Sequence, residues 1–487
     1  MSKLDKNILF LIFEELQDDS KFLFSCLMVN KIWCETVIPI LWRNPWYYVV
    51  DYHTRNSLYS ILTSYLSNNI KEFLSKKGIQ ISSQSFAFDY LSFCRSIDIE
   101  TIDEIISIGS PLEYNRFLLQ EEIYSFLIKK CPEIKYLNIC GTYEILYLPD
   151  VKAHLESLYE LTCDTLIDPK YFYGLAHICQ QIQRIIIINK NVKVNHGTTK
   201  LIEFQKNLKY FRWVDEFKVE VGFHYWELLV DPYTEIFNVL KKHANTLNHF
   251  QFDSYSDNYN NDGDYTFLQD ALLELRNLKI LKISSPLLSN NDDFNKKLEM
   301  MPFRNLEFIE IEFIYIYQIN YIIKNSLFLR ELKINCFYTE KDSFNDDSLD
   351  FIRTIYENCF LIEYLTIPMF PLLENYFIEF EKLLKKCQNL RSLYFIYTSN
   401  IREGNEFEYW DYLSNVLIKE ASTNLKEIGI PFGIRFSLET LEAFFEKWKG
   451  RPAISIYLVD FHIYQTDSYR KLINKYKIEG VVKDINL

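Results

Sequence analysis

Cysteine and histidine are the residue types of this sequence that most often act as nucleophiles, general bases or metal ligands. The ten cysteines occupy positions 26, 34, 94, 131, 140, 163, 179, 336, 359 and 387. No two of them are closer than eight residues, so the C-x-x-C spacing of zinc and thiol redox sites is missing. The nearest two histidines, His243 and His249, are six residues apart, a spacing that does not place both rings on one helical face.

Known catalytic motifs are also missing from the sequence. It contains no G-x-x-x-x-G-K-[ST], G-x-G-x-x-G, H-E-x-x-H or G-x-S-x-G. We therefore expect no catalytic site, no cofactor and no metal site, and we interpret Cys131, Cys359 and Cys387 as buried core residues. The alternative is an enzyme carried on the fold. It would need a deep pocket that holds strongly perturbed ionisable groups.

The composition limits the partners and the compartment. Lys and Arg number 53 and Asp and Glu 66 among 487 residues, which gives a net charge of −13. Nucleic acids and anionic membranes attract basic surfaces, so we expect neither as a partner. The apolar run Ile8–Phe13 is too short for a signal sequence, and no apolar stretch of 18 residues occurs. Scattered cysteines do not form a disulfide framework, so we expect an intracellular protein, cytoplasmic or nuclear.

A short pattern, apolar-x-x-apolar-x-apolar, returns along most of the chain. Its first positions are 134, 158, 182, 208, 247, 278, 306, 329, 362, 390 and 425, a mean step of about 29 residues. Segments with helical periodicity lie between these patterns, as in 267–275 and 437–448. One short strand and one helix in each repeat resemble a divergent leucine-rich repeat. The resemblance implies an α/β solenoid in which stacked units share one core.

The pattern also suggests how the chain is divided. We assign residues 1–46 to an N-terminal helical domain, 47–465 to the solenoid and 466–487 to a C-terminal cap. The repeats are clear from about residue 131. The segment 91–99 is a candidate early strand, and an amphipathic pattern in the last 20 residues favours a covering helix.

Side chains that flank the middle apolar position of each strand pattern are expected to point away from the core, onto the exposed sheet face. Tyrosine and arginine often anchor protein interfaces, so this face is the expected site for a target protein. The stretch from Arg184 to Lys282 favours an acidic or phosphorylated partner. Ordinary solvated sheet residues are the alternative. The candidate target-binding residues are Tyr136, Arg184, Tyr210, Arg212, His249, Lys282, Tyr364 and Tyr394.

The first 46 residues carry the most specific local signal. Apolar residues from Leu4 to Leu16 recur at helical spacing behind Asp5, a suitable N-cap. A polar break at 17–20 offers caps for a second helix. A third segment begins near Ile32, and we expect it to end near Pro39, since proline disrupts a helix after its first turn.

These residues resemble the F-box, a family whose pattern includes a paired Ile-Phe, a later Val-x-x-x-Trp and a closing Leu-Trp. The sequence matches at Ile12-Phe13, Val29 to Trp33 and Leu41-Trp42, with Asp5 where the family usually has proline. The resemblance implies docking on the Skp adaptor of a cullin-RING ubiquitin ligase. The implied adaptor-facing or domain-forming residues are Leu4, Ile8, Leu9, Ile12, Phe13, Leu16, Val29, Trp33 and Trp42.

Taken together, the two resemblances imply a non-catalytic adaptor that recruits a target protein to the cullin complex for ubiquitination. The alternative within the same class is an interaction scaffold that binds through its repeats without causing degradation. The sequence does not separate the residues that contact the adaptor from those that pack internally.

Overall fold

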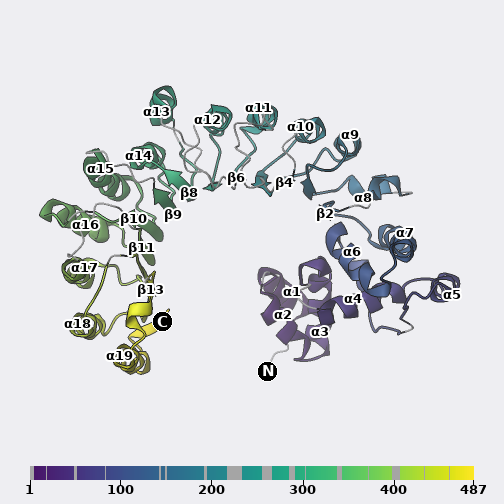
Figure 1. Ribbon diagram of the computed structural model, residues 1–487, viewed down its shortest axis with the longest axis horizontal. Coiled ribbons are helices and arrows are strands. Elements are labelled where there is room, and N and C mark those ends of the chain that lie inside the picture. The colour runs from purple at the N-terminus through teal and green to yellow at the C-terminus, as the bar shows by residue number, and fades with distance from the viewer. Residues whose placement is uncertain are drawn as a thin grey trace. The chain divides into compact units, whose positions relative to one another are not determined.

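The computed structural model describes residues 5–17, 19–48, 52–82, 84–141, 144–148, 151–190, 195–216, 233–254, 266–284, 291–301, 303–336, 343–370, 372–396, 406–432, 434–459 and 461–486. The chain forms two compact units. The first comprises Met1–Val219 and Val230–Val239, and the second comprises Glu220–Leu229 and Leu240–Leu487. In each unit the helices cover one side of a row of parallel strands (Figure 1).

The first unit begins with helices and only then enters its sheet. Its strands are β1 (Ser96–Asp98), β2 (Tyr136–Asn138), β3 (Glu160–Asp164), β4 (Arg184–Asn189) and β5 (Tyr210–Asp215), each paired in parallel with the next. Its helices are α1 (Lys6–Glu15), α2 (Ser20–Leu27), α3 (Lys31–Leu41), α4 (Tyr52–Ser64), α5 (Asn68–Lys76), α6 (Ile99–Ile106), α7 (Glu113–Lys130), α8 (Val151–Leu155), α9 (Pro169–Ile178) and α10 (His196–Glu203). Helix α11 (Thr234–Leu240) reaches the division between the units.

The second unit alternates strand and helix throughout. Its parallel strands are β6 (His249–Asp253), β7 (Ile280–Ser284), β8 (Phe308–Ile314), β9 (Glu331–Cys336), β10 (Tyr364–Pro368), β11 (Ser392–Ile396), β12 (Glu427–Ile430), β13 (Ile454–Leu458) and β14 (Val482–Ile485). Its helices are α12 (Thr266–Glu274), α13 (Asp292–Glu299), α14 (Ile316–Ile323), α15 (Ser343–Asn358), α16 (Glu374–Lys386), α17 (Glu406–Glu420), α18 (Leu438–Trp448) and α19 (Asp467–Ile478). No described helix is both long and apolar enough to span a bilayer.

The eleven repeated sequence patterns coincide with strands β2 to β12, and their middle apolar residues pair with one another across the sheet. In the second unit, for example, Leu281 pairs with Ile309, and Ile309 pairs with Leu332. All three side chains are buried. The predicted alternation of strands and helices in a repeating array is therefore confirmed. The early strand expected in 91–99 is also present, as β1.

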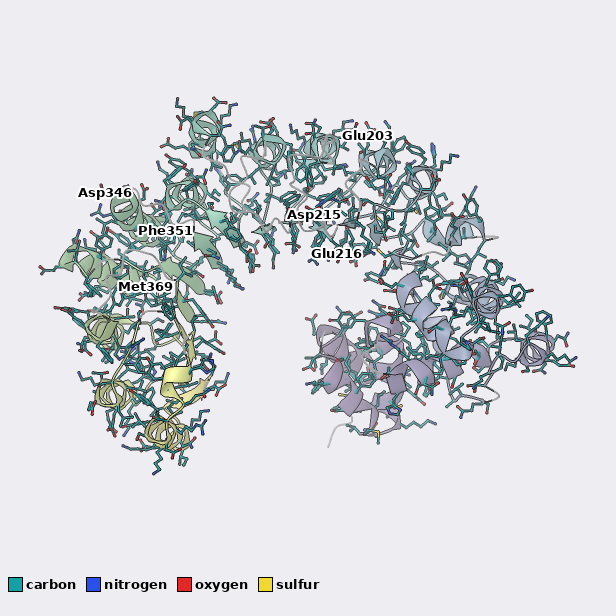
Figure 2. The ribbon with its side chains drawn as sticks, viewed as in Figure 1. Glu203, Asp215, Glu216, Asp346, Phe351 and Met369 are labelled. Carbon is teal, nitrogen blue, oxygen red and sulfur yellow. The ribbon has the colours of Figure 1, made fainter. Side chains whose placement is uncertain are left out.

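Burial follows the expected periodicity of two. Along β7, Leu281 and Ile283 are buried, whereas Ile280 and Lys282 on the other face are partly exposed. The helix layer covers the buried face. In α15, Phe351 lies on the side toward the strands and Asp346 on the outer side (Figure 2). Each repeat thus shares its apolar core with its neighbours.

The third helix ends close to Pro39, as expected, but the proline lies inside the helix and does not terminate it. Helix α3 continues through Pro39 to Leu41, and the N–H of Trp42 donates to the Ile38 carbonyl at 3.0 Å. The proline removes one helical hydrogen bond. Burial of Ile40 and Leu41 in the core of the three-helix unit offsets that loss.

Hydrogen bonds join the N-terminal helices to the first strand. The Trp46 indole is buried, and its Nε1 donates to the Ser96 carbonyl at 2.9 Å. The backbone N–H of Arg95 and the Ser96 hydroxyl both donate to the Arg43 carbonyl, at 2.9 and 3.1 Å. The three-helix unit is therefore an integral part of the first unit, fixed to the edge of its sheet.

Polar side chains at the ends of strands form a buried ladder in the first unit. The sequence lacks a regular asparagine after each strand, yet Asn189 of β4 is fully buried and donates to Asp215 of β5 at 2.8 Å. The Trp213 indole and the Tyr233 hydroxyl also donate to Asp215, at 2.7 and 2.9 Å. Figure 2 shows Asp215 and its neighbour Glu216 on the strand side of this unit.

We predict that Asp215→Ala lowers the free energy of unfolding of the first unit by about 3 kcal/mol. The change leaves three buried donors without their acceptor, at a cost of about 1 kcal/mol or more each. Urea unfolding followed by tryptophan fluorescence measures the difference. Glu216→Ala, at the exposed neighbouring position, is the control and should change stability by less than about 0.5 kcal/mol. Equal effects of the two substitutions would contradict the prediction.

Candidate interaction surfaces

The structure separates the sequence-predicted N-terminal residues into an interior group and an exposed group. Leu9 and Phe13 are buried in the core of the three-helix unit. Leu16, Trp33 and Trp42 are partly buried and pack against that core. Leu4 lies outside the described residues.

The exposed group is larger than the sequence indicated. Ile8 and Ile12 of α1 are exposed, at 49% and 42%, and so is Val29. Other exposed apolar side chains from the same helices and the α2–α3 turn extend this group. We define the N-terminal apolar set as Ile8, Leu11, Ile12, Phe22, Phe24, Met28, Val29 and Ile32.

The helices that carry this set pack closely together. Lys6 of α1 lies 3.9 Å from Glu35 of α3, so the start of α1 adjoins the first turns of α3. Ile8 and Ile32 are near neighbours of this pair in sequence. The sequence did contain a signal for the extra members: all six residues from Ile8 to Phe13 are apolar, which is more than one helical face can bury.

On the sheet face of the first unit, the predicted residues are joined by short contacts. Arg184 of β4 pairs with Glu160 of β3, with 2.6 Å between Nε and Oε2. Its guanidinium lies 3.7 Å from the ring centre of Tyr210, which it covers. Tyr136 is exposed and Arg212 is partly exposed. The positive charge of Arg184 is thus largely compensated within the sheet.

On the sheet face of the second unit, cations and aromatic rings alternate from strand to strand. Lys282 of β7 lies 4.6 Å from the ring centre of Phe308 of β8. Lys333 of β9 lies 4.9 Å from the same ring and 4.6 Å from the ring of Tyr364 of β10. Both lysines also pair with carboxylates, Lys282 with Glu310 at 2.9 Å and Lys333 with Glu331 of its own strand at 3.1 Å. His249 of β6 is partly exposed.

The row continues as stacked tyrosines. Tyr364 stacks on Tyr394 of β11 with ring centres 5.0 Å apart, and Tyr394 stacks on Tyr457 of β13 at 5.9 Å. Between β11 and β13 lies β12, where Gly429 is opposite both Tyr394 and Tyr457 in register. A methyl group at Gly429 would overlap the Tyr394 ring, so only glycine leaves room for this stack. We call Tyr364, Tyr394 and Tyr457 the tyrosine row.

Burial and a neighbouring carboxylate keep Tyr364 and Tyr394 protonated. Burial, followed by the negative charge of Glu427, raises the pKa of Tyr394 well above its usual range. The pKa of Tyr364 is raised mainly by burial as well. The Tyr394 hydroxyl donates to Glu427 at 3.4 Å, and the Ser392 hydroxyl donates to the same carboxylate oxygen at 2.9 Å. Tyr457 was missed from sequence because Ala453 stands where other strand patterns begin with a larger apolar residue.

Three buried cysteines lie at the ends of repeat helices and belong to the core. Cys179 and Cys387 are the C-terminal caps of α9 and α16, and Cys359 follows α15. The Cys179 thiol donates to the Leu155 carbonyl of the preceding repeat at 3.3 Å. Burial raises the pKa of Cys179, Cys359 and Cys387 to about 12, so these thiols resist forming the nucleophilic thiolate.

Metal-ligand clusters and surface hollows were the other candidate sites in the described residues. No group of three or more His, Cys, Asp or Glu side chains is placed to hold a metal ion in the described part of the chain. A hollow of about 580 Å³ on the second unit is lined by Lys241, Asp270, Leu273, Glu274, Arg276, Lys297, Met300 and Met301. A second hollow of about 540 Å³, on the first unit, borders Tyr136 and Tyr159.

Comparisons with known proteins give matches among solved structures. No family model matches the sequence, and no curated protein matches it. A chain in the crystal structure of the Rad7 and Elc1 complex in yeast is similar over 94% of this chain and 95% of that chain, with 13% identity and a TM-score of 0.39. A likeness at this level does not transfer a function from one chain to the other.

We predict that iodoacetamide at pH 8 leaves Cys179, Cys359 and Cys387 unmodified in the folded protein. A pKa of about 12 leaves roughly one thiol in ten thousand ionised at that pH, and burial blocks the reagent. Peptide mass spectrometry measures the labelling. Partly exposed Cys34 is the control and should be labelled in the folded protein. Labelling of Cys359 as fast as Cys34 would show that a reactive thiol has been overlooked.

Proposed function

We propose that this chain is a substrate-recognition subunit of a cullin-RING ubiquitin ligase. Its three N-terminal helices act as an F-box that docks on a Skp adaptor, and its strand–helix repeats act as divergent leucine-rich repeats that hold a target protein. The covalent transfer of ubiquitin belongs to other subunits, and the chain contributes proximity and orientation.

The observation that carries the proposal is the N-terminal apolar set. The interior of the three-helix unit is already filled by Leu9, Phe13, Leu23, Cys26, Val37, Ile40 and Leu41. Eight further large apolar side chains between Ile8 and Ile32 nevertheless face solvent. An exposed apolar group of this size on so small a unit is typical of a surface that a partner protein covers.

The departure from the F-box pattern at Asp5 leaves the start of the first helix intact. Asp5 caps α1 by accepting a hydrogen bond from the N–H of Asn7 at 3.4 Å. Its φ of −63° is also the value that proline would impose. The substitution therefore preserves the entry of the chain into α1 and the orientation of Ile8 and Ile12.

The fixed attachment of the three-helix unit supports the same function. An adaptor subunit must hold its target at a defined position relative to the ligase, and a loose joint would weaken that control. The buried Trp46 and the hydrogen bonds around Ser96 hold the docking helices directly against β1.

A scaffold that binds targets without causing their degradation would use the same two surfaces. The half-life of a bound target in cells with and without this chain separates the two functions. A ligase subunit shortens the half-life, whereas a scaffold leaves it unchanged.

We predict that Ile12→Glu in the full chain weakens binding of a purified Skp adaptor at least about tenfold. The substitution puts a charge into a surface that must become dry on docking. Titration calorimetry measures the dissociation constant. The point substitution is preferable to removal of residues 1–46, which would also take away Arg43 and Trp46 and disturb the edge of the sheet.

The matched control is Met300→Glu, which places the same charge on another exposed apolar residue, 76% accessible, in the second unit. It should leave adaptor affinity unchanged. The proposal fails if the unmodified chain does not bind a Skp adaptor, or if both substitutions have the same effect.

A further inference from the structure

We infer that the sheet face of the second unit recognises a basic side chain of the target, with arginine preferred, at the Tyr457 end of the tyrosine row, beside the strand that carries Glu427. The inference rests on the proposed function in that it names the partner class of the target-binding face. It concerns strands β10 to β13, outside the stretch from Arg184 to Lys282 for which the sequence favoured an acidic or phosphorylated partner.

On this face lysines lie over Phe308 and Tyr364, and the row of aromatic rings continues beyond them to Tyr394 and Tyr457. Lys282 and Lys333 together cover Phe308 and one face of the row at Tyr364. Across the described residues, no cation of the chain lies over the rings of Tyr394 or Tyr457. Tyr364 and Tyr457 stack on the two faces of the Tyr394 ring, so the outer face of Tyr457 is the aromatic surface of the row that no cation of the described residues covers.

The charge on this part of the face is negative. Lys282 and Lys333 are already neutralised by Glu310 and Glu331. Glu427 contacts only hydroxyl groups, those of Ser392 and Tyr394, and has no cationic partner among the described residues. A partner that docks here has to compensate a carboxylate, which favours a basic side chain and disfavours a phosphate.

The geometry suits a guanidinium better than an ammonium. Tyr394 and Tyr457 are stacked at an angle of 21°, and Tyr457 is 39% exposed, so a planar group can extend the stack on its outer side. Arginine combines stacking on an aromatic ring with a hydrogen-bonding fork for a carboxylate. Within the chain, Arg184 shows the same combination, since it lies over Tyr210 while it pairs with Glu160.

Gly429 is the residue that makes this arrangement possible. Because it has no side chain, the Tyr394 ring lies across β12 and reaches Tyr457, two strands away from its own backbone. Any larger residue would push the ring aside and separate the aromatic surface from Glu427.

The test uses the full chain and a fluorescein-labelled glycine–serine peptide that carries two arginines. Matched peptides replace the arginines by citrulline, which keeps the shape without the charge, by lysine, or by phosphoserine. Fluorescence anisotropy at low salt measures binding. We expect the arginine peptide to bind at least about tenfold more tightly than the citrulline peptide, and the lysine peptide to fall between them.

Three substitutions locate the site. Tyr457→Ala, Glu427→Gln and Gly429→Ala should each weaken binding of the arginine peptide by about three- to tenfold. The matched controls are Phe407→Ala and Glu408→Gln on helix α17, both at exposed positions, and they should leave it unchanged. Circular dichroism verifies that every variant is folded.

Several results would overturn the inference. These are equal affinity for the arginine and citrulline peptides, no binding of the arginine peptide up to about 1 mM, unchanged affinity in all three site variants, or preference for phosphoserine. Titration of the Skp adaptor on the same preparations keeps the two proposals apart. If the unmodified chain binds the adaptor but not the arginine peptide, only this inference is rejected, and if it binds the arginine peptide but not the adaptor, only the ligase function is rejected.

Discussion

The apolar side chains on one face of every strand can be covered only by neighbouring repeats and by the helix layer. Leu281 and Ile283 of β7 illustrate this constraint, since both are buried although their own strand is five residues long. Parallel pairing keeps equivalent residues of successive strands in register, so the core is continuous within each unit. The same pairing aligns the residues of the opposite face into rows, and those rows make the tyrosine row and its lysine neighbours possible.

The N-terminal helices meet the same constraint in another way. They bury a small core of their own and use Trp46 to close the edge of the sheet at Ser96. The N-terminal apolar set remains exposed beside this core. A unit of this size gains limited stability from its own interior, so its attachment to the repeats adds to its stability.

Much of the fold could be predicted from sequence because a short apolar spacing recurs. That spacing located β2 to β12, but β13 escaped because Ala453 occupies the first position of its pattern. From sequence, Pro39 was expected to terminate α3, but the helix continues to Leu41. The burial of Ile40 and Leu41 depends on tertiary packing, which local sequence patterns do not show. Buried partners such as Asn189 and Asp215 come together only through strand register.

The sequence predicted which types of residue lie on the candidate surfaces, but it did not predict which of their charges are paired. Arg184 and Lys282 looked like free positive charges in the sequence, whereas the fold sets each beside a glutamate on a neighbouring strand. The sequence around Glu427 and Gly429 does not indicate a binding site. Their role follows from the strand register, which places Tyr394 on one side of β12 and Tyr457 on the other. The separation of Leu9 and Phe13 from Ile8 and Ile12 likewise required the packing of α1 against α3.

Hydrogen–deuterium exchange of the full chain, with and without a saturating Skp adaptor, tests most directly whether the N-terminal helices are the docking surface. Docking on the N-terminal apolar set should slow amide exchange in α1 and in the α2–α3 turn near Met28 and Val29. Exchange in β11 to β13 should stay unchanged, because the proposed adaptor contact does not include these strands. Slower exchange confined to the sheet strands, or no change in α1 at saturation, would contradict the proposed role of these helices.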